Sequence, residues 1–249
     1  MKDVAIVAIG YKAEMTDGEK LSFKRCLDVF QKRDIFVVGP LNVSRDEYVK
    51  INENKSEINF INLEEKWFKS VFTYGKMLMQ KWFYELFLEY KYILIYQLDC
   101  YVFNDNLDYF VSLDYDYYGA TWLWDNTFYC VGNGGLSLRK ISAFIENLEE
   151  RKDLDFINSD KCDYFIEDHA FCTGFYPLKN ICPINIAEQF SFETSIFNRN
   201  PDEMSIEDFP MGIHGFANSF KINFCGKDVM LSDYLIRAIK RWNELNSKL

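Results

Sequence analysis

The sequence predicts an α/β protein with a mostly parallel central sheet flanked by helices and a small antiparallel portion in its second half. Residues 92–96 form an unbroken apolar and aromatic run, which is typical of a strand buried on both faces. Residues 4–9 and 35–38 are short apolar runs separated by an amphipathic segment, residues 21–32. A strand, a helix and a strand at this spacing indicate a right-handed parallel crossover.

The remaining elements follow from periodicity and turn residues. Tyr74, Leu78, Trp82 and Leu86 recur every four residues, which predicts one long helix over residues 74–90. The other expected elements are a short helix at 46–50, strands at 58–63, 115–120 and 135–138, helices at 141–150 and 164–171, a polar loop at 154–161, and an amphipathic helix at 231–245.

Composition excludes several classes of function. The chain has 249 residues, with 28 basic and 38 acidic side chains and a formal charge of -10, so a nucleic-acid partner is not expected. Seven scattered cysteines without a C-x-x-C pair, and two histidines, argue against a zinc module and favour a reducing cytoplasm. We see no signal peptide and no apolar run of the ~20 residues that a spanning helix needs.

Two polar clusters follow predicted strands. Asp99 comes directly after the run at 92–96, and the carboxyl ends of strands are where α/β sheets bind ligands. Gly134 and Gly135 lack a Cβ, so their backbone N–H groups can face a bound group closely. The alternatives are an aspartate that caps its own turn and ordinary turn chemistry in the glycine stretch.

Two further clusters lie later in the chain. Glu167 and Asp168 form an acidic pair that can supply a general base, or else the solvated face of a helix. His214, between Gly212 and Gly215, can share a divalent metal with a distant carboxylate, or else is a structural histidine in a turn. Taken singly, the glycines, the acidic pair and His214 are more simply explained as structural, and Asp99 fits either explanation equally; it is the order of the four clusters that favours one shared site.

That order resembles the glycosyltransferase A fold, in which a metal-bound nucleotide sugar is attacked by an acceptor hydroxyl. More closely, three stretches resemble a poorly characterised bacterial family of sugar transferases with this fold: Y-I-L-I-Y-Q-L-D at 92–99, Y-D-Y-x-G-A-x-W at 115–122 and V-G-N-G-G-x-S-L-R-K at 131–140. The resemblance runs from Val4 to about Phe216. It implies one domain, with a nucleotide-binding half at 1–104, an acceptor and catalytic half at 105–226 and a terminal helix at 227–249.

The resemblance also implies roles. Asp99 matches the last acid of a D-x-D motif and would ligate Mn²⁺ or Mg²⁺, and His214 would complete the binding of the metal or the diphosphate. Gln97 stands where the first acid usually is, and an amide ligates Mn²⁺ poorly, so we expect weak metal binding. Glu167 and Asp168 resemble the E-D motif of inverting members, in which Asp168 would be the base.

Donor contacts are implied in the same way. Tyr11 would stack on the base, for which uracil is commonest in this fold, and Lys76 or Arg139 would offset the charge of the diphosphate. The full set of implied donor-binding residues is Gly10, Tyr11, Lys76, Gln97, Asp99, Asn133, Gly134, Gly135 and Arg139.

We therefore expect a glycosyltransferase that moves a sugar from a UDP-sugar to a glycan or lipid-linked acceptor, by inversion. Loss of the first acid at Gln97 leaves an inactive binding protein of the same fold as an alternative, and a retaining transferase is another. A metal-dependent phosphoesterase or nucleotidyltransferase is less favoured, because only two histidines are available. The sequence does not indicate the donor sugar, the acceptor or the oligomeric state.

The last helix carries basic side chains. Arg237, Lys240 and Arg241 lie within residues 228–245 and could rest on an anionic membrane, which would place the protein at the inner face of the plasma membrane. The simpler alternative, which we favour, is an ordinary docking helix with a solvated basic face.

Overall fold

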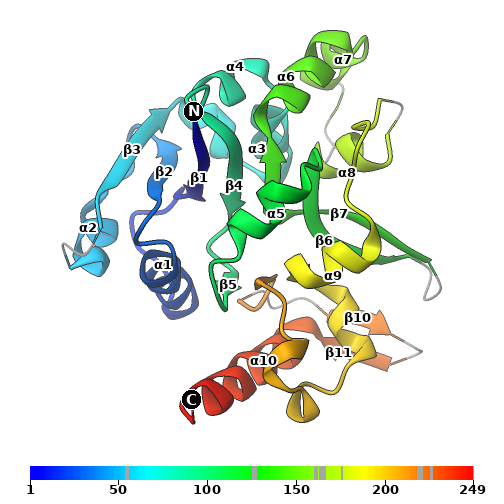
Figure 1. Ribbon diagram of the computed structural model, residues 1–249. Helices are drawn as coiled ribbons and strands as arrows, with labels where there is room; N and C mark the ends of the chain where they lie inside the picture. The colour runs from blue at the N-terminus through cyan, green and yellow to red at the C-terminus, as the bar shows by residue number, and fades with distance from the viewer. Residues whose placement is uncertain are drawn as a thin grey trace.

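The structure, a computed structural model, describes residues 1–53, 56–124, 128–159, 162, 167–174, 176–217, 221–224 and 227–248. A six-stranded sheet with the order β3-β2-β1-β4-β7-β6 forms its centre. Helices cover this sheet, and the terminal helix α10 (Leu231–Asn246) lies at the opposite end of the molecule from the N-terminus (Figure 1). The predicted α/β class is confirmed.

The first half is a parallel sheet with short crossovers. Four strands, β1, β2, β3 and β4, pair in parallel, and α1 starts with a capping box in which Thr16 and Glu19 exchange hydrogen bonds. Residues 92–96 are buried on both faces, as predicted. The bounds are β1 (Lys2–Ile9), α1 (Asp17–Val29), β2 (Asp34–Pro40), α2 (Asp46–Asn52), β3 (Ile58–Leu63), η1 (Glu65–Phe68), α3 (Val71–Leu78), α4 (Lys81–Glu85) and β4 (Tyr90–Tyr96).

The second half extends the sheet with two antiparallel strands. β7 (Phe128–Lys140) pairs with β4 and with β6 (Tyr117–Trp124), and both pairings are antiparallel. β6 therefore runs in the same direction as β1 and β4. Helices α5 (Leu107–Leu113), α6 (Ile141–Glu150), α7 (Leu154–Asn158), α8 (Glu167–Cys172) and α9 (Ile184–Phe190) belong to this half.

A small sheet and a hairpin complete the fold. β9 (Gly212–His214) lies between β5 (Cys100–Val102) and β8 (Ser191–Phe192), and β10 (Lys221–Phe224) pairs with β11 (Lys227–Met230). Three 3-10 turns, η2 (Thr194–Asn198), η3 (Pro201–Glu203) and η4 (Ile206–Asp208), lead toward β9 and contact α10.

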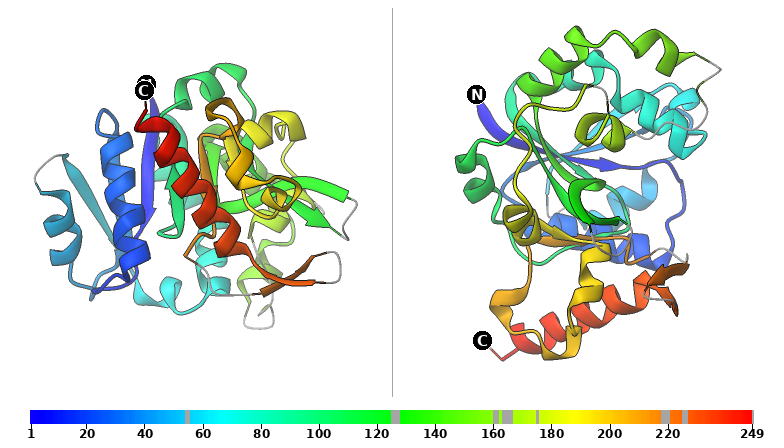
Figure 2. Two further views of the ribbon diagram at one scale, coloured as in Figure 1. Left: turned by 90° about the horizontal axis from the view of Figure 1, so that it is seen from below. Right: turned by 90° about the vertical axis from the view of Figure 1, so that its right-hand side faces the viewer.

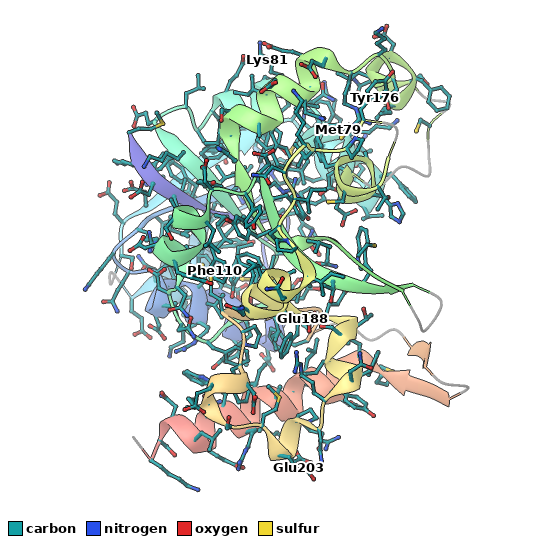
Figure 3. The ribbon with its side chains drawn as sticks, turned by 45° about the vertical axis from the view of Figure 1, so that its right-hand side comes forward. Met79, Lys81, Phe110, Tyr176, Glu188 and Glu203 are labelled. Atoms are coloured by element: carbon teal, nitrogen blue, oxygen red, sulfur yellow. The ribbon has the colours of Figure 1, made fainter. Side chains whose placement is uncertain are left out.

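The apolar residues form two clusters. The main cluster packs around the central sheet and includes Phe110 of α5, which is labelled in Figure 3. The ring of Phe110 contacts that of Phe190 of α9, with ring centroids 5.1 Å apart. The second cluster lies beneath α10 and includes Phe103, Leu235 and Trp242. The right-hand view of Figure 2 shows α10 and the short helices before it as a layer beside the sheet.

Three predictions about local structure are wrong. Residues 74–90 form two helices, α3 and α4, because the chain is extended at Gln80, whose side chain donates to the Lys76 carbonyl (2.8 Å) and to Asn158 Oδ1 (2.7 Å). Residues 131–135 lie inside strand β7 and not in a turn. Residues 154–158 are helical, where we expected a loop.

The other predicted elements are present. Most of their observed bounds differ by a few residues from the predicted ones, whereas the strand predicted at 135–138 is the longer β7, which begins at Phe128. The predicted helix at 164–171 begins outside the described residues, and its described part is α8. In the part of the chain that the structure describes, no helix combines the length and the apolar character needed to cross a membrane.

Candidate active site

A cleft of about 1040 Å³ opens at the carboxyl ends of β1, β4 and β6. Six of the residues singled out from the sequence line it: Tyr11, Gln97, Asp99, Asn133, Asp168 and His214. A cleft of this size fits a ligand of nucleotide dimensions or larger. The structure thus brings together residues that lie far apart in the chain.

Asp99 and His214 are neighbours in this cleft. His214 Nε2 lies 3.3 Å from Asp99 Oδ1 and 3.2 Å from Gln97 Oε1. The backbone fixes the pair, because β5 and β9 align Cys100 with His214, and the N–H groups of Gly215 and Phe216 donate to the Asp99 carbonyl (3.0 and 3.2 Å). Gly215 has φ of 91°, a conformation that favours glycine.

A second carboxylate flanks the histidine ring from the other side. Glu193 Oε1 lies 3.3 Å from His214 Nδ1, at ion-pair distance but without the alignment of a hydrogen bond. Burial lowers the pKa of His214, yet the Asp99 and Glu193 carboxylates outweigh burial and raise it to about 10. The ring is therefore an imidazolium at neutral pH in the absence of a bound cation.

Gly135 leaves room for that ring. A Cβ built on Gly135 would lie 2.0 Å from His214 Nε2, far inside van der Waals contact. The Gly135 carbonyl accepts from the Gln97 N–H (2.9 Å), and the Gly135 N–H donates to Asn133 Oδ1 (3.2 Å). The glycine therefore allows β7 to pass directly beneath the Asp99–His214 pair.

The donor set around His214 fits a divalent cation. Asp99, Cys100 and His214 offer ligand atoms within 4.8 Å of one another among the described residues. Burial raises the pKa of the Cys100 thiol well above its usual range, and its Sγ donates to the Gly135 carbonyl (3.3 Å), so it remains a thiol. The Asp99 carboxylate is the kind of hard oxygen ligand that Mn²⁺ or Mg²⁺ prefers, the His214 imidazole is a borderline ligand and the Gln97 amide a weak one, so the set fits a weakly held cation.

Asp168 also lines this cleft, and it belongs to helix α8, which packs against β7. It is 7 % exposed, and its two oxygens accept from the N–H of Gly134 (2.9 Å) and of His169 (2.7 Å). Burial, together with the charge of Glu167, raises the pKa of Asp168 to about 8 despite these hydrogen bonds. A carboxyl group poised near neutral pH is suited to proton transfer.

Arg139 does not line the cleft. It is fully buried, and its guanidinium donates to Glu167 Oε1 (2.9 Å), Ser137 Oγ (2.9 Å), Tyr84 Oη (3.2 Å) and the Gly134 carbonyl (3.4 Å). Glu167 is likewise buried in this ion pair and does not line the cleft. The two residues support the floor on which Gly134 and Asp168 lie.

Four other predicted donor contacts lie outside the cleft lining. Lys76 Nζ donates to the Ser159 carbonyl (2.8 Å). The Gly10 carbonyl accepts from Arg45 Nη1 (2.7 Å), and its neighbour Tyr11 faces the cleft instead. Gly134 and Gly135 contribute backbone beneath Asp168 and His214.

Several lining residues escaped the sequence analysis. Trp122 and His169 stack on each other with ring centroids 5.0 Å apart and planes at 23°, and both line the cleft. Lys12 and Lys69 line it as well. Trp122 ends the string at 115–122 and His169 follows the acidic pair, so the sequence offered a signal for both.

Residues 57–214 match the model of a family described as "Protein of unknown function (DUF5672)". This match covers more than half of the chain. The protein belongs to this family. The matched DUF5672 region contains Asp99, Asp168 and His214. A search of curated proteins finds no match.

Solved structures of glycosyltransferases share the fold. The apo form of the glycosyltransferase GlyE of Streptococcus pneumoniae TIGR4 aligns with a TM-score of 0.56 and 13% identity over 99% of this chain, which spans 63% of GlyE. Mouse xyloside xylosyltransferase 1 aligns with a TM-score of 0.53 and 11% identity, covering 87% of this chain and 98% of that one. These likenesses confirm the predicted glycosyltransferase A fold.

A third neighbour was solved with ligands. Core-mannan synthase A of Aspergillus fumigatus, in its Mn/GDP form, aligns with a TM-score of 0.52 and 8% identity, covering 72% of this chain and 71% of that one. At such low sequence identities, the similarity is evidence for the fold alone.

Proposed function

We propose that this DUF5672 protein is a glycosyltransferase that moves a sugar from a nucleotide sugar, a UDP-sugar in the simplest case, to a hydroxyl of a glycan or lipid-linked acceptor, with inversion. The observation that carries the proposal is the meeting of Asp168 and the Asp99–His214 pair in one cleft at the carboxyl ends of the sheet. The fold supports it, since ligands of open α/β sheets bind at this edge.

Asp168 is the proposed base. The acceptor hydroxyl gives its proton to the Asp168 carboxylate as its oxygen bonds to the anomeric carbon of the donor. The bond between that carbon and the diphosphate oxygen breaks on the opposite face, and the nucleoside diphosphate leaves with the electron pair. The N–H groups of Gly134 and His169 hold the carboxylate in one orientation, which favours a productive geometry.

Asp99, His214 and the Gln97 amide would hold Mn²⁺ or Mg²⁺, which when bound stabilises the negative charge that develops on the leaving diphosphate. Binding a cation requires the imidazolium of His214 to release its proton. Glu193 Oε1, 3.3 Å from the other ring nitrogen, would then face the Nδ1 side of the neutral ring, which is the side from which carboxylates orient many metal-ligating histidines.

We propose Lys12 and Lys69 as the cations that offset the charge of the diphosphate, because they line the cleft, whereas Lys76 and Arg139 do not. Lys12 Nζ is also paired with Glu19 Oε1 (2.7 Å), which lines the cleft too. Tyr11 is 46% exposed with Lys12 Nζ 5.2 Å from its ring centroid, and we keep it as the residue that stacks on the base.

The basic face of α10 supports the docking-helix interpretation over membrane contact. Arg237 pairs with Asp202, and Arg241 donates to the Met204 carbonyl (3.0 Å), so both hold the helix to its own protein. We accordingly propose that the protein does not depend on a membrane surface, and the scattered free cysteines support a cytoplasmic location.

The test is nucleotide release from a panel of nucleotide sugars, with and without Mn²⁺, followed by determination of the anomeric configuration of the product. Asp168→Asn should lose at least 100-fold in turnover while its donor affinity stays within about twofold, as expected for loss of a general base. Asp155→Asn, an exposed aspartate on α7, is the matched control and should behave as the wild type.

Each alternative has its own outcome. Thermal shifts with nucleotide sugars but no release or transfer would identify the inactive binding protein that Gln97 suggests. A product with the donor's anomeric configuration would identify a retaining transferase. Normal turnover of Asp168→Asn would show that the base is another residue.

A further inference from the structure

A cysteine lies beside the Asp99–His214 pair. Cys100 is the first residue of β5 and the cross-strand partner of His214 in β9, so these two side chains project from the same face of the small sheet. Asp99 lies in the turn before β5, where the alternation of a strand does not turn its side chain away from that of Cys100. Ligand atoms of Asp99, Cys100 and His214 all lie within 4.8 Å of one another. The three side chains can therefore share one cation.

The sulfur of Cys100 is held in place by its surroundings. The residue is fully buried, and its Sγ donates to the carbonyl of Gly135, the glycine that also leaves room for the His214 ring (3.3 Å). The Cys100 N–H donates to the Gln97 carbonyl (3.0 Å), which closes the turn that carries Asp99. These contacts keep the sulfur beside the Asp99–His214 pair before any cation binds.

The Cys100 sulfur suits some divalent cations and not others. Burial raises the pKa of Cys100, so without a bound metal it is a neutral thiol. Mn²⁺ and Mg²⁺ prefer oxygen ligands and have little affinity for sulfur. Zn²⁺ binds cysteine sulfur, histidine nitrogen and aspartate oxygen in one tetrahedral site, and it displaces the proton of a coordinating thiol. The set thus offers Zn²⁺ a ligand that it does not offer Mn²⁺.

Glu193 supplies the outer contact that zinc-ligating histidines commonly have. Its Oε1 lies 3.3 Å from His214 Nδ1, while Nε2 of the same ring lies 3.3 Å from Asp99 Oδ1. A carboxylate on the second nitrogen fixes the orientation of a metal-ligating histidine. The ring is therefore already turned with Nε2 toward the position that the three ligands share.

We propose that Asp99, Cys100 and His214 form a site for Zn²⁺, a thiophilic cation, and that Zn²⁺ at this site excludes Mn²⁺. As the sulfur bonds to the cation, the thiol proton passes to solvent. The three protein ligands leave one tetrahedral position for water. Competition with Mn²⁺ follows because Asp99 and His214 belong to both ligand sets. Inhibition of sugar transfer by Zn²⁺ would rest on the proposed function, whereas Zn²⁺ binding itself does not.

The direct test is metal binding by the full-length protein with no nucleotide sugar present. The wild type should bind Zn²⁺ in competition with a chromophoric chelator, and Cys100→Ser should weaken this binding by about tenfold or more. Binding of Mn²⁺, measured by electron paramagnetic resonance, should change by less than about twofold in Cys100→Ser, because Mn²⁺ does not use the sulfur. Serine can keep the hydrogen bond to the Gly135 carbonyl but is a poor zinc ligand.

Two further variants are the controls. Cys182→Ser should bind both metals as the wild type does, because Cys182 is also buried but belongs to no such ligand set among the described residues. Asp99→Ala should weaken the binding of both metals, because both use the carboxylate. Cys100→Ala replaces Cys100→Ser should the serine variant not fold.

Co²⁺ provides a readout that a merely structural role of Cys100 would not change. Co²⁺ substitutes for Zn²⁺ in tetrahedral sites, and a sulfur bonded to it absorbs in the near ultraviolet by charge transfer. The wild type loaded with Co²⁺ should show this band, and the folded Cys100→Ser protein should lack it.

The outcomes separate this inference from the proposed function. The inference alone is overturned by a wild type that binds no Zn²⁺, by equal Zn²⁺ binding in wild type and Cys100→Ser, by equal losses of Zn²⁺ and Mn²⁺ binding in that variant, or by absence of the cobalt–sulfur band. Unchanged Zn²⁺ binding by Asp99→Ala would put the cation at another site and also overturn it. Zn²⁺ binding that depends on Cys100, in a protein that releases no nucleotide from any nucleotide sugar, would sink the proposed function and keep the zinc site.

Discussion

Replacing Arg139 by methionine should destabilise the protein strongly. The guanidinium is 0 % exposed and is the ion-pair partner of Glu167, which is 4 % exposed. Removing one partner of a buried pair leaves the other charge without compensation, which costs about 3–5 kcal/mol. Tyr84, Ser137 and the Gly134 carbonyl would lose a donor at the same time.

The assay is urea denaturation followed by circular dichroism. Arg139→Met should lower the free energy of unfolding by about 3–5 kcal/mol, and the double variant with Glu167→Leu should recover most of that loss, because an apolar pair can replace a buried ion pair. The control is Arg237→Met, whose partner Asp202 is at the surface and whose loss should cost about 1 kcal/mol or less.

The same variants decide what Arg139 does. If it supports the cleft floor, folded Arg139→Met at low temperature should bind a nucleotide sugar with unchanged affinity. A tenfold loss of donor affinity together with a loss of stability below about 1 kcal/mol would refute this reasoning and restore the original interpretation of Arg139 as a diphosphate ligand.

Three further predictions concern the cleft. For the wild type, kcat/KM should rise with pH through neutrality, because burial and the charge of Glu167 raise the pKa of Asp168 and the base must be ionised to accept a proton. A pH profile that is flat between about 6 and 9 would contradict the assignment. Gly135→Ala should overpack against His214, which should lower the free energy of unfolding by about 1–3 kcal/mol in urea denaturation and weaken Mn²⁺ binding in calorimetry. Gly18→Ala should lower the free energy of unfolding less, because a Cβ at Gly18 would lie 3.2 Å from its nearest neighbour, the Ala217 Cβ. The ion pairs of His214 raise its pKa from 6.5 to about 10, so their stabilisation of the folded protein is complete below pH 6.5 and is lost as the pH rises toward 10. In Glu193→Gln, the free energy of unfolding should fall at a lower pH than in the wild type, and an unshifted pH dependence would argue against the ion pair.

Much of the fold was predictable because its central strands are buried on both faces. The run at 92–96 is typical of a strand of this kind, and a residue that follows such a strand, here Asp99, lies at the edge of the sheet where ligands bind. The break between α3 and α4 at Gln80 was not predictable from periodicity, because no glycine or proline marks it. Two hydrogen bonds of the Gln80 side chain stabilise it, one to the Lys76 carbonyl and one to Asn158, which is distant in the sequence.

The candidate site was predictable in its acids and histidine but not in its supporting residues. The positive charge of Arg139 would suit a diphosphate, but the tertiary structure shows that Arg139 forms a buried ion pair with Glu167 instead. The glycines at 132–135 look like a turn, yet each makes space for a neighbouring side chain within a strand, for example His214 above Gly135. Glu193 was missed because it reaches His214 through the parallel pairing of β8 with β9.

The backbone ladder that joins Asp99 to β9 has a consequence for binding energetics. Since main-chain groups hold the segments of Asp99 and His214 in place, the coordinating atoms are preorganised before any cation arrives. Binding of a cation would therefore order little of the backbone. The main free-energy costs of binding would be the dehydration of the cation and the deprotonation of His214. Asp99→Ala should then remove a coordinating carboxylate while the backbone ladder persists and Glu193 still pairs with His214, which makes this variant a reference protein for ligand titrations.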